Sequence, residues 1–331
     1  MYTEDLTPSA AADFEAFYAS SRHRPPAAAP GDVLALSCDG KGVVVLPRDI
    51  RPQQQRRNRK RAPKQDGRLS RGEVRTRKRI AETGAVFDIT PVPRTPADIT
   101  GPAAGPRRDG PRAKGKWVTA SITRDASHVV ASVLAEADRR DPDRRRTWIA
   151  LMDGNNHQIA LIKAAAEERG IAITIICDYI HVIEYLWEAA WCFHPEASPG
   201  AAGWVRDRAA AILDGRALDV AAGIREQAAA AQLSPAKAKT AATVVTYLEN
   251  KAPYLRYPAA LASGWPISSG VIEGTCRHLV KDRMDITGAR WGIHTAEAIL
   301  KLRALITNGD LDTYWDYHRQ QEHKRNYQTA A

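Results

Sequence analysis

The sequence predicts an α/β fold, in which helices flank a central sheet. Between residues 145 and 193, short runs of continuously apolar residues alternate with longer segments whose apolar residues recur at three- and four-residue steps. Continuously apolar runs are typical of strands buried on both faces, and the longer pattern is typical of helices. Each apolar run also ends at an aspartate. Strand, helix, strand and helix in this order indicate parallel neighbours within the sheet.

The first predicted element is a β-hairpin. In "DVLALSCDGKGVVVLP", residues 32–47, two apolar runs flank Asp-Gly-Lys-Gly, and glycine readily adopts the positive φ values of a tight turn. We therefore expect the first strand to end at Asp39.

Two segments without a core pattern follow. Residues 48–79 hold 14 Lys or Arg against three acids, which predicts a solvated loop, a phosphate-binding arm that orders on DNA, or both. Residues 101–116 consist mainly of Gly, Pro and charged residues. This composition predicts a flexible loop.

From residue 117 onward the elements follow one another closely. The sequence predicts a helix in "SHVVASVLAEADRR", a buried strand in "RTWIALMDG", a helix closed by Gly170 in "HQIALIKAAAEERG", a second buried strand in "IAITIICD" and a helix in "HVIEYLWEAAWCF". Ala-rich segments over residues 198–262 predict an all-helical insert. The helix of Glu273 comes next, and two amphipathic helices around an Asn-Gly turn follow it.

Composition and charge narrow the function classes. Apolar residues make up 44% of the chain and charged residues 26%, as in globular proteins. No apolar run approaches the ~20 residues that span a bilayer, the acidic N-terminus lacks a signal-peptide pattern, and the four cysteines are scattered. We expect a cytoplasmic protein without a membrane partner. The net charge of +10 and the pI near 9.5 favour an anionic partner, most often nucleic acid.

Carboxylates at the predicted strand ends indicate a metal site. Asp39, Asp153 and Asp178 each follow an apolar run, and open α/β sheets collect their ligands at the carboxyl ends of strands. Together with Glu273 on a helix, these residues in a basic protein suggest phosphoryl transfer assisted by two metal ions. Mg²⁺ or Mn²⁺ is the ion that such oxygen ligands favour.

Each aspartate also has a structural interpretation, which the sequence leaves open. Asp39 can be the first position of a hairpin turn, and Asp153 can cap a helix that begins near Asn155. Asp178 can cap the next helix or hold His181 in place.

The helix of Glu273 carries charges at regular steps. Glu273, Arg277 and Lys281 are four residues apart, which fits a solvated ion-pair ladder worth ~0.2–0.5 kcal/mol per pair. The same spacing fits an active-site helix with a metal ligand beside two phosphate contacts. With Ser269 as N-cap, Glu273 falls one position beyond a capping box; with Gly270 as N-cap it reaches the box position, but no hydroxyl is there to reciprocate.

Several longer blocks carry a family resemblance. They are "LSCDGKGVV", "RRTWIALMDGNNHQI", "ITIICDYIHVIEYLWEAAWCFH", "PISSGVIEGTCRHLVKDRMDITGARWG" and the tail "AEAILKLRALITNGDLDTYWDYHRQQEH". These blocks resemble the ISKra-type transposases of bacterial insertion sequences, which are Mutator-related. The resemblance covers about residues 32 to 325.

The resemblance implies a ribonuclease H-like fold, which is a mixed sheet flanked by helices, with an all-helical insertion before the helix of the catalytic glutamate. It also implies a DDE triad of Asp39, Asp153 and Glu273 that binds Mg²⁺ or Mn²⁺, with two ions expected. Asp178 and His181 take supporting roles. In the alternative assignment, Asp178 replaces one of the other two aspartates as a direct ligand.

The same resemblance implies a division of the chain into four parts. These are a lead-in at 1–31 that is the remainder of a shortened end-recognition region, a first part of the catalytic core at 32–197 with the basic arm 48–79 and the loop 101–116, a helical insertion at 198–263, and a last part of the core at 264–331 with the C-terminal helices.

The implied activity is metal-dependent cleavage of transposon DNA ends, followed by strand transfer into target DNA. The expected partners are the terminal inverted repeats, the target DNA and further copies of the chain, assembled on DNA in the nucleoid. The predicted DNA contacts are Arg277, Lys281, Arg283, Arg56, Arg57, Arg59, Lys60 and Arg61.

Two other functions fit the same residues. A ribonuclease H-like structure-specific nuclease, such as a junction resolvase, shares the carboxylates but needs no insert or basic arm. A DNA-binding regulator derived from an inactive transposase is a different class. The triad residues argue against complete loss of activity, but the short region before the first strand keeps the regulator open, because such transposases usually carry a further N-terminal region.

Overall fold

One mixed sheet organises the chain. The computed structural model describes residues 3–20, 31–52, 77–100, 109–286 and 288–327. The five strands of the sheet lie in the order β3-β2-β1-β4-β5. Their bounds are β1 (Val33–Val44), β2 (Lys78–Ile89), β3 (Ala113–Ser121), β4 (Trp148–Met152) and β5 (Ile173–Cys177).

The directions of the strands divide the sheet into two halves. β1, β2 and β3 are antiparallel neighbours, whereas β4 runs parallel to β1 and β5 runs parallel to β4. β4 and β5 are the two apolar runs that the sequence predicts as buried strands, and every residue of β4 is buried. The predicted α/β class, with a mixed sheet flanked by helices, is confirmed.

The predicted hairpin at Asp39 is wrong. β1 runs without a break from Val33 to Val44, so Asp39 lies inside the strand and opposite Thr83 of β2. Gly40 and Gly42 do not have positive φ values. A Cβ at Gly40 would lie 2.6 Å from Ile80 Cγ2 on β2, so this glycine gives room to a neighbouring strand instead of making a turn.

The strands β2 and β3 do not follow from the apolar pattern. The predicted loop at 101–116 is wrong at its end, because residues 113–116 begin β3; residues 101–108 lie outside the described part of the chain. The basic segment 48–79 connects β1 to β2. Its residues 53–76 also lie outside the described part, with the predicted DNA contacts Arg56, Arg57, Arg59, Lys60 and Arg61.

Helices cover both faces of the sheet. Those before the glutamate segment are α1 (Thr3–Ala10), α2 (Phe14–Ser20), α4 (Pro96–Thr100), α5 (Ala126–Arg140), α6 (Asn156–Glu168), α7 (Tyr179–Phe193), α8 (Pro199–Leu213), α9 (Ala217–Ala230), α10 (Pro235–Lys251) and α11 (Tyr257–Ala262). Those after it are α12 (Gly270–Thr275), a π-helical turn (Cys276–Lys281), α13 (Asp282–Met284), α14 (Ile293–Asn308) and α15 (Leu311–Tyr327). Short 3-10 turns occupy Pro47–Asp49 and Ala252–Tyr254.

Adjacent residues of β2 show which helix lies on which face. Gly84 faces α5, since a Cβ there would lie 2.4 Å from Val133 Cγ2. Thr83 faces the opposite side, where its hydroxyl lies 3.0 Å from Cys276 Sγ in the π-helical turn. Successive side chains of a strand point to opposite faces. α5 and α6 therefore cover one face, and α12, the π-helical turn and α14 cover the other.

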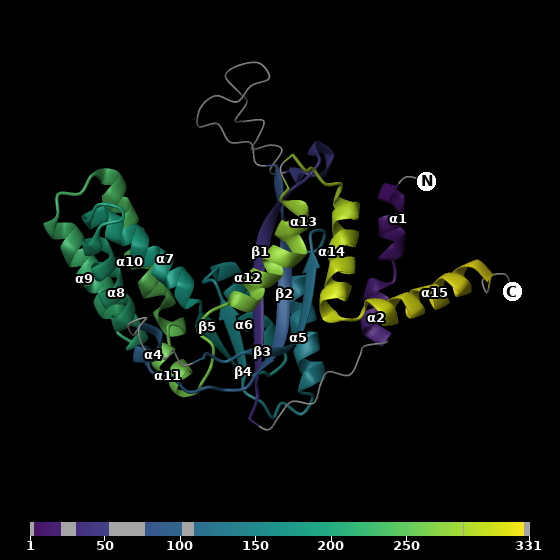
Figure 1. The fold of residues 1–331 in the computed structure, drawn as a ribbon, viewed down its shortest axis with the longest axis horizontal. Coiled ribbons are helices and arrows are strands. Elements are labelled where there is room, and N and C mark those ends of the chain that lie inside the picture. Colours follow the sequence, from purple (N-terminus) through teal and green to yellow (C-terminus); the bar gives the residue numbers. More distant parts are fainter. Residues whose placement is uncertain (1–2, 21–30, 53–76, 101–108, 287, 328–331) are drawn as a thin grey trace, which may run out of the picture.

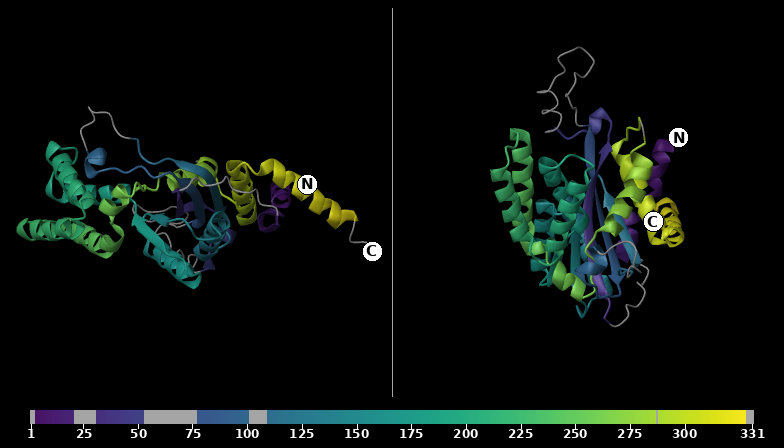
Figure 2. Two further views of the ribbon diagram at one scale, coloured as in Figure 1. Left: turned by 90° about the horizontal axis from the view of Figure 1, so that it is seen from below. Right: turned by 60° about the vertical axis from the view of Figure 1, so that its left-hand side comes forward.

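Helical groups extend the molecule at both ends of its long axis (Figure 1). Beyond β5, the described elements between Pro199 and Ala262 are helices, and α8 and α10 pack against α7. At the other end, α1 and α2 pack against α14 and α15 (Figure 2). The predicted Asn-Gly turn between the last two helices is confirmed, since Gly309 ends α14 with φ 75°.

No helix in the described ranges is both long enough and apolar enough to cross a bilayer.

Candidate functional site

Three aspartates lie level with one another across the parallel half of the sheet. The β1–β4 register pairs residues 114 positions apart, as in Leu34 with Trp148, and Asp39 and Asp153 differ by the same number. The β4–β5 register pairs residues 25 positions apart, as in Met152 with Cys177; this offset links Asp153 to Asp178. Adjacent strands lie ~4.8 Å apart. Asp153 and Asp178 directly follow β4 and β5, and Asp39 lies inside β1, two residues beyond the last β1–β4 pair.

Asp39 is connected to the helix segment that follows Glu273. Its Oδ2 accepts a hydrogen bond from Cys276 Sγ at 3.2 Å, and its Oδ1 accepts one from the Gly40 amide at 2.6 Å. Burial, with the Asp39 carboxylate as a second cause, raises the pKa of Cys276 to about 12. Cys276 therefore remains a thiol near neutral pH and can donate to Asp39.

Asp153 follows β4 directly, as predicted, but it is not the helix cap. Its Oδ1 accepts from the Asn155 amide at 2.8 Å, and Asn155 is the N-cap of α6, accepting from His157 N. Asp153 is half-buried. It forms the turn that precedes the helix and keeps an accessible edge of its carboxyl group.

Asp178 joins two segments that are far apart in the sequence. It is fully buried and is the N-cap of α7, where its Oδ1 accepts from Ile180 N at 2.7 Å. Its Oδ2 accepts from the Ser269 amide at 2.8 Å and from the Ser269 hydroxyl. The capping interpretation of Asp178 is confirmed, and the same carboxylate fixes the start of the glutamate helix.

The structure decides between Ser269 and Gly270 as the N-cap of α12. Ser269 is the N-cap, which places Glu273 at the fourth helical position. The Ser269 side chain makes no capping bond to the helix because its hydroxyl donates to Asp178 instead. The position of Glu273 is thus set from outside the helix, by the buried Asp178.

Ligand atoms of Asp178, His181 and Glu273 come within 4.8 Å of one another. Glu273 is exposed, and His181 is half-buried with its Nδ1 2.8 Å from Glu184 Oε2. Burial disfavours the imidazolium, yet the Glu184 hydrogen bond and the charges of Asp178, Glu184 and Asp153 outweigh it and raise the pKa of His181. Asp178 and His181 thus lie close together, but the hydrogen bond of His181 is to Glu184 and not to Asp178; their supporting roles stay a prediction.

The charged stripe after Glu273 does not form an ion-pair ladder. Cys276–Lys281 form a π-helical turn, which changes the four-residue spacing. Arg277 Nε lies 3.8 Å from Asp282 Oδ1, and within the described ranges neither Arg277 nor Lys281 pairs with Glu273. Both basic side chains are exposed, as a contact to a DNA backbone requires.

Contacts from α14 accompany this π-helical turn. Arg303 donates through Nε to the carbonyl of Leu279 at 3.1 Å, and through Nη2 to the carbonyl of His278. The wider turn and its partner on α14 are not visible in the sequence pattern. The same holds for Thr83 and Cys276, which contact Asp39 from two other elements. For Ser269, the Ser-Ser-Gly run before the helix is a usable signal.

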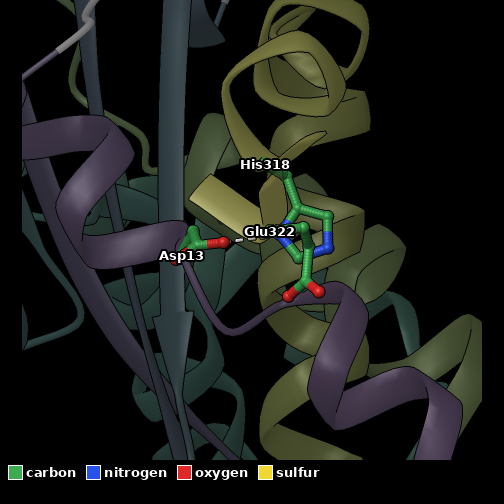
Figure 3. A group of neighbouring side chains, drawn as sticks. All are labelled: Asp13, His318 and Glu322. Carbon is green, nitrogen blue, oxygen red and sulfur yellow. Dashed lines mark hydrogen bonds and ion pairs between the residues drawn. The ribbon is translucent and has the colours of Figure 1, made fainter. Parts of the chain in front are cut away.

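A second group of possible metal ligands lies away from the sheet edge. Asp13, His318 and Glu322 approach one another between the N-terminal helices and α15 (Figure 3). Asp13 accepts from His318 Nδ1 at 2.6 Å and from the two terminal nitrogens of Arg325 at 2.7 and 2.8 Å. Because a guanidinium already occupies both carboxylate oxygens, we interpret this group as an ion-pair network, not as a metal site.

No protein-family model matches the chain, and comparison with curated proteins and with solved structures gives no significant match.

Proposed function

We propose that this chain is a DDE transposase of a bacterial insertion sequence, with a ribonuclease H-like fold and with Asp39, Asp153 and Glu273 as its catalytic carboxylates. The sequence blocks that resemble ISKra-type transposases motivate the proposal. The mixed sheet, the helices α8–α11 before the glutamate segment and the basic segment between β1 and β2 are consistent with it.

One observation carries the proposal furthest. Asp39 and Asp153 are separated by the 114-residue offset of the β1–β4 register, and Cys276, less than one turn after Glu273, donates to Asp39. Among the described residues, the group at this sheet end whose ligand atoms lie within 4.8 Å of one another is Asp178, His181 and Glu273. The register offset and the Cys276 hydrogen bond support a shared site for Asp39, Asp153 and Glu273.

The donor set suits a hard divalent cation. Carboxylate oxygens are the preferred ligands of Mg²⁺ and Mn²⁺, and Asp39, Asp153 and Glu273 would hold the ion or ion pair. When bound, such ions activate water and stabilise charge on the oxygens of a phosphodiester. Arg277 and Lys281 would bind the DNA backbone beside the site, and a homo-oligomer would hold the two transposon ends.

Asp178 would act as a positioning residue in this scheme, in place of the alternative role as a direct ligand. Its two oxygens already accept from three donors, and it is fully buried. We infer that Asp178 orients Glu273 through Ser269, and that His181, held by its contact with Glu184, supports the site beside the carboxylates.

The test is Mg²⁺- or Mn²⁺-dependent nicking of labelled DNA taken from both flanks of the gene. We expect Asp39→Asn, Asp153→Asn and Glu273→Gln each to lower cleavage by roughly 10²–10³-fold while DNA binding is kept, since a preorganised electrostatic contact is lost. Glu226→Gln, on the exposed face of α9, is the matched carboxylate control and should cut normally.

Each other outcome has a distinct meaning. Wild-type protein that binds these ends but never cuts them would contradict the transposase proposal and favour a regulator. Cleavage of branched DNA without strand transfer into a target plasmid would favour a structure-specific nuclease. Full activity in Glu273→Gln would reject the assignment of the triad.

A further inference from the structure

An arginine-lined pocket lies at the C-terminal end of β1. Its volume is about 360 Å³, and three arginines line it together with an indole ring and a hydroxyl group. These residues are Arg48, Arg283, Arg290, Trp291 and Thr295. Arg283 is among the DNA contacts expected from the sequence; Arg48, Arg290 and Trp291 are not.

Backbone hydrogen bonds fix the shape of this arginine pocket. Trp291 N donates to the Val44 carbonyl at 3.0 Å, and Leu46 N donates to the Trp291 carbonyl at 2.9 Å. The segment before α14 is therefore attached to the end of β1. The indole of Trp291 donates to the Met284 carbonyl at 3.2 Å, and the Arg283 guanidinium lies 5.4 Å from its ring centroid.

The charge in the pocket is almost entirely positive. No carboxylate is among the described residues that line it, and Arg283 and Arg290 form no ion pair within the described ranges. Asp49 is beside it: its Oδ2 lies 3.9 Å from Arg48 Nε and accepts from Ile293 N at 3.2 Å. Asp49 thus lies near Arg48 alone among the three arginines by the printed ion pair, and the charge of the lining stays positive.

The ligand chemistry follows from these groups. Guanidinium groups match the oxygens of phosphate in a two-pronged geometry, and a hydroxyl adds a further donor. The N-terminus of α14, whose N-cap is Gly292, lies at the same place and favours negative charge. This combination of donors favours a phosphate group over an apolar ligand.

We propose that the arginine pocket binds a backbone phosphate of the DNA substrate, at a distance from the cleaved bond. This inference rests on the proposed function for its ligand source, although a free phosphate would use the same chemistry. Val45, one residue beyond the end of β1, is six residues from Asp39, or about 20 Å at ~3.3 Å per residue. Phosphates on one strand of duplex DNA are ~3.4 Å apart along the axis, so a duplex whose axis runs along β1 would place the bound phosphate about five to seven nucleotides from the cut.

The experiment combines a variant with a modified substrate. Arg290→Gln should reduce the salt dependence of DNA binding by about one unit of slope and weaken binding by about tenfold. A neutral methylphosphonate placed at successive positions should weaken wild-type binding five to seven nucleotides from the cut, apart from any positions that Arg277 and Lys281 contact beside the cut. The same substitution should have no further effect on Arg290→Gln, because the contact is already absent.

Two controls keep structural damage apart from the loss of a contact. Arg206→Gln, on the exposed surface of α8, removes an equal charge far from the pocket and should leave the methylphosphonate pattern unchanged. Arg290→Lys keeps the charge and should restore most of the salt dependence. Equal melting temperatures for the variants would exclude unfolding as the cause.

The outcomes separate this inference from the proposed function. Wild-type protein can cut DNA while each methylphosphonate weakens binding by Arg290→Gln as much as binding by wild type. In that case the pocket inference is wrong and the transposase proposal stands. If the protein binds no DNA, the transposase proposal fails, and titration with inorganic phosphate decides on the pocket. Saturable phosphate binding that Arg290→Gln removes would show a free phosphate as the source; no binding would overturn the phosphate site.

Discussion

At the scale of single residues, Asp39, Asp153 and Asp178 have equivalent register but different environments. Asp178 is buried with all its hydrogen bonds made inside the protein, whereas Asp39 and Asp153 are partly accessible. A buried carboxylate with three donors is a structural anchor, because an added ion would have to displace hydrogen bonds. Under the proposed function, this difference in accessibility favours Asp39 and Asp153 over Asp178 as direct ligands.

The titration of His181 gives a residue-scale prediction. Glu184→Gln removes the hydrogen bond that helps to raise the pKa of His181, so this pKa should fall. Because the folded pKa lies above the ordinary 6.5, stability from charged His181 is complete below pH 6.5 and is lost as the pH rises through the folded value. NMR titration of the imidazole protons measures the shift.

Glu188, one turn further along α7, supplies the control. It is exposed and is not among the groups that shift His181, so Glu188→Gln should leave the titration unchanged. An unaltered His181 pKa in Glu184→Gln would show that the contact with Glu184 does not hold the imidazole in solution.

At the scale of elements, the sequence predicts those strands and helices whose patterns are uninterrupted. β4 and β5 are continuous apolar runs, and α5, α6 and α7 have regular helical spacing. The hairpin prediction for β1 is wrong because Gly40 and Gly42 resemble turn residues, whereas close approach of β2 requires them to lack side chains. That requirement depends on a strand about 40 residues away, which local pattern cannot reveal.

Two glycines test the packing of elements with the same chemical change. A Cβ at Gly84 would lie 2.4 Å from Val133 Cγ2 and 3.0 Å from Val129 Cγ1 of α5. Gly84→Ala should therefore overpack the interface and lower the free energy of unfolding by about 1–3 kcal/mol. Urea denaturation measures this change.

Gly223 should respond in the opposite direction. It lies inside α9, and a Cβ added there would meet no atom of another element within 4 Å. Gly223→Ala should stabilise the protein by about 0.5–1 kcal/mol, because alanine is the better helix former. If Gly84→Ala were also neutral or stabilising, α5 would not pack on the sheet as closely as described.

At the scale of the whole molecule, the two ends of the described chain are tied together. Asp13 contacts His318 and Arg325, and the Tyr314 hydroxyl donates to the Ala10 carbonyl at 2.7 Å. The sequence predicts the helices near both ends but gives no sign that they meet, since the partners are about 300 residues apart. For the same reason, the three carboxylates could be named from the sequence, but not their hydrogen-bond partners.

Loss of the Asp13 network should destabilise the fold in a pH-dependent way. Hydrogen bonds from Arg325 and then His318 outweigh burial and lower the pKa of Asp13 below its ordinary 3.8. Its contribution is present above pH 3.8 and is lost as the pH falls through the folded pKa. Asp13→Asn should cost roughly 1.5–3 kcal/mol at pH 7 and progressively less below pH 3.8, measured by urea unfolding.

Asp316→Asn provides the comparison for Asp13→Asn. Asp316 pairs with Arg319 on the exposed side of α15, and such surface pairs contribute ~0–1 kcal/mol. Equal effects of the two substitutions would mean that the Asp13 network contributes no more than an ordinary surface pair.

The meeting of the two ends has a consequence during synthesis. Phe17 is fully buried against Tyr314 and Tyr317, which leave the ribosome about 300 residues later. Because synthesis adds ~5–20 residues per second, roughly 15–60 s pass between the synthesis of Phe17 and that of Tyr314 and Tyr317. During that interval the N-terminal aromatic side chains form an exposed apolar surface on every nascent chain. A chaperone, or a neighbouring chain on the same messenger RNA, can bind this surface before folding is complete.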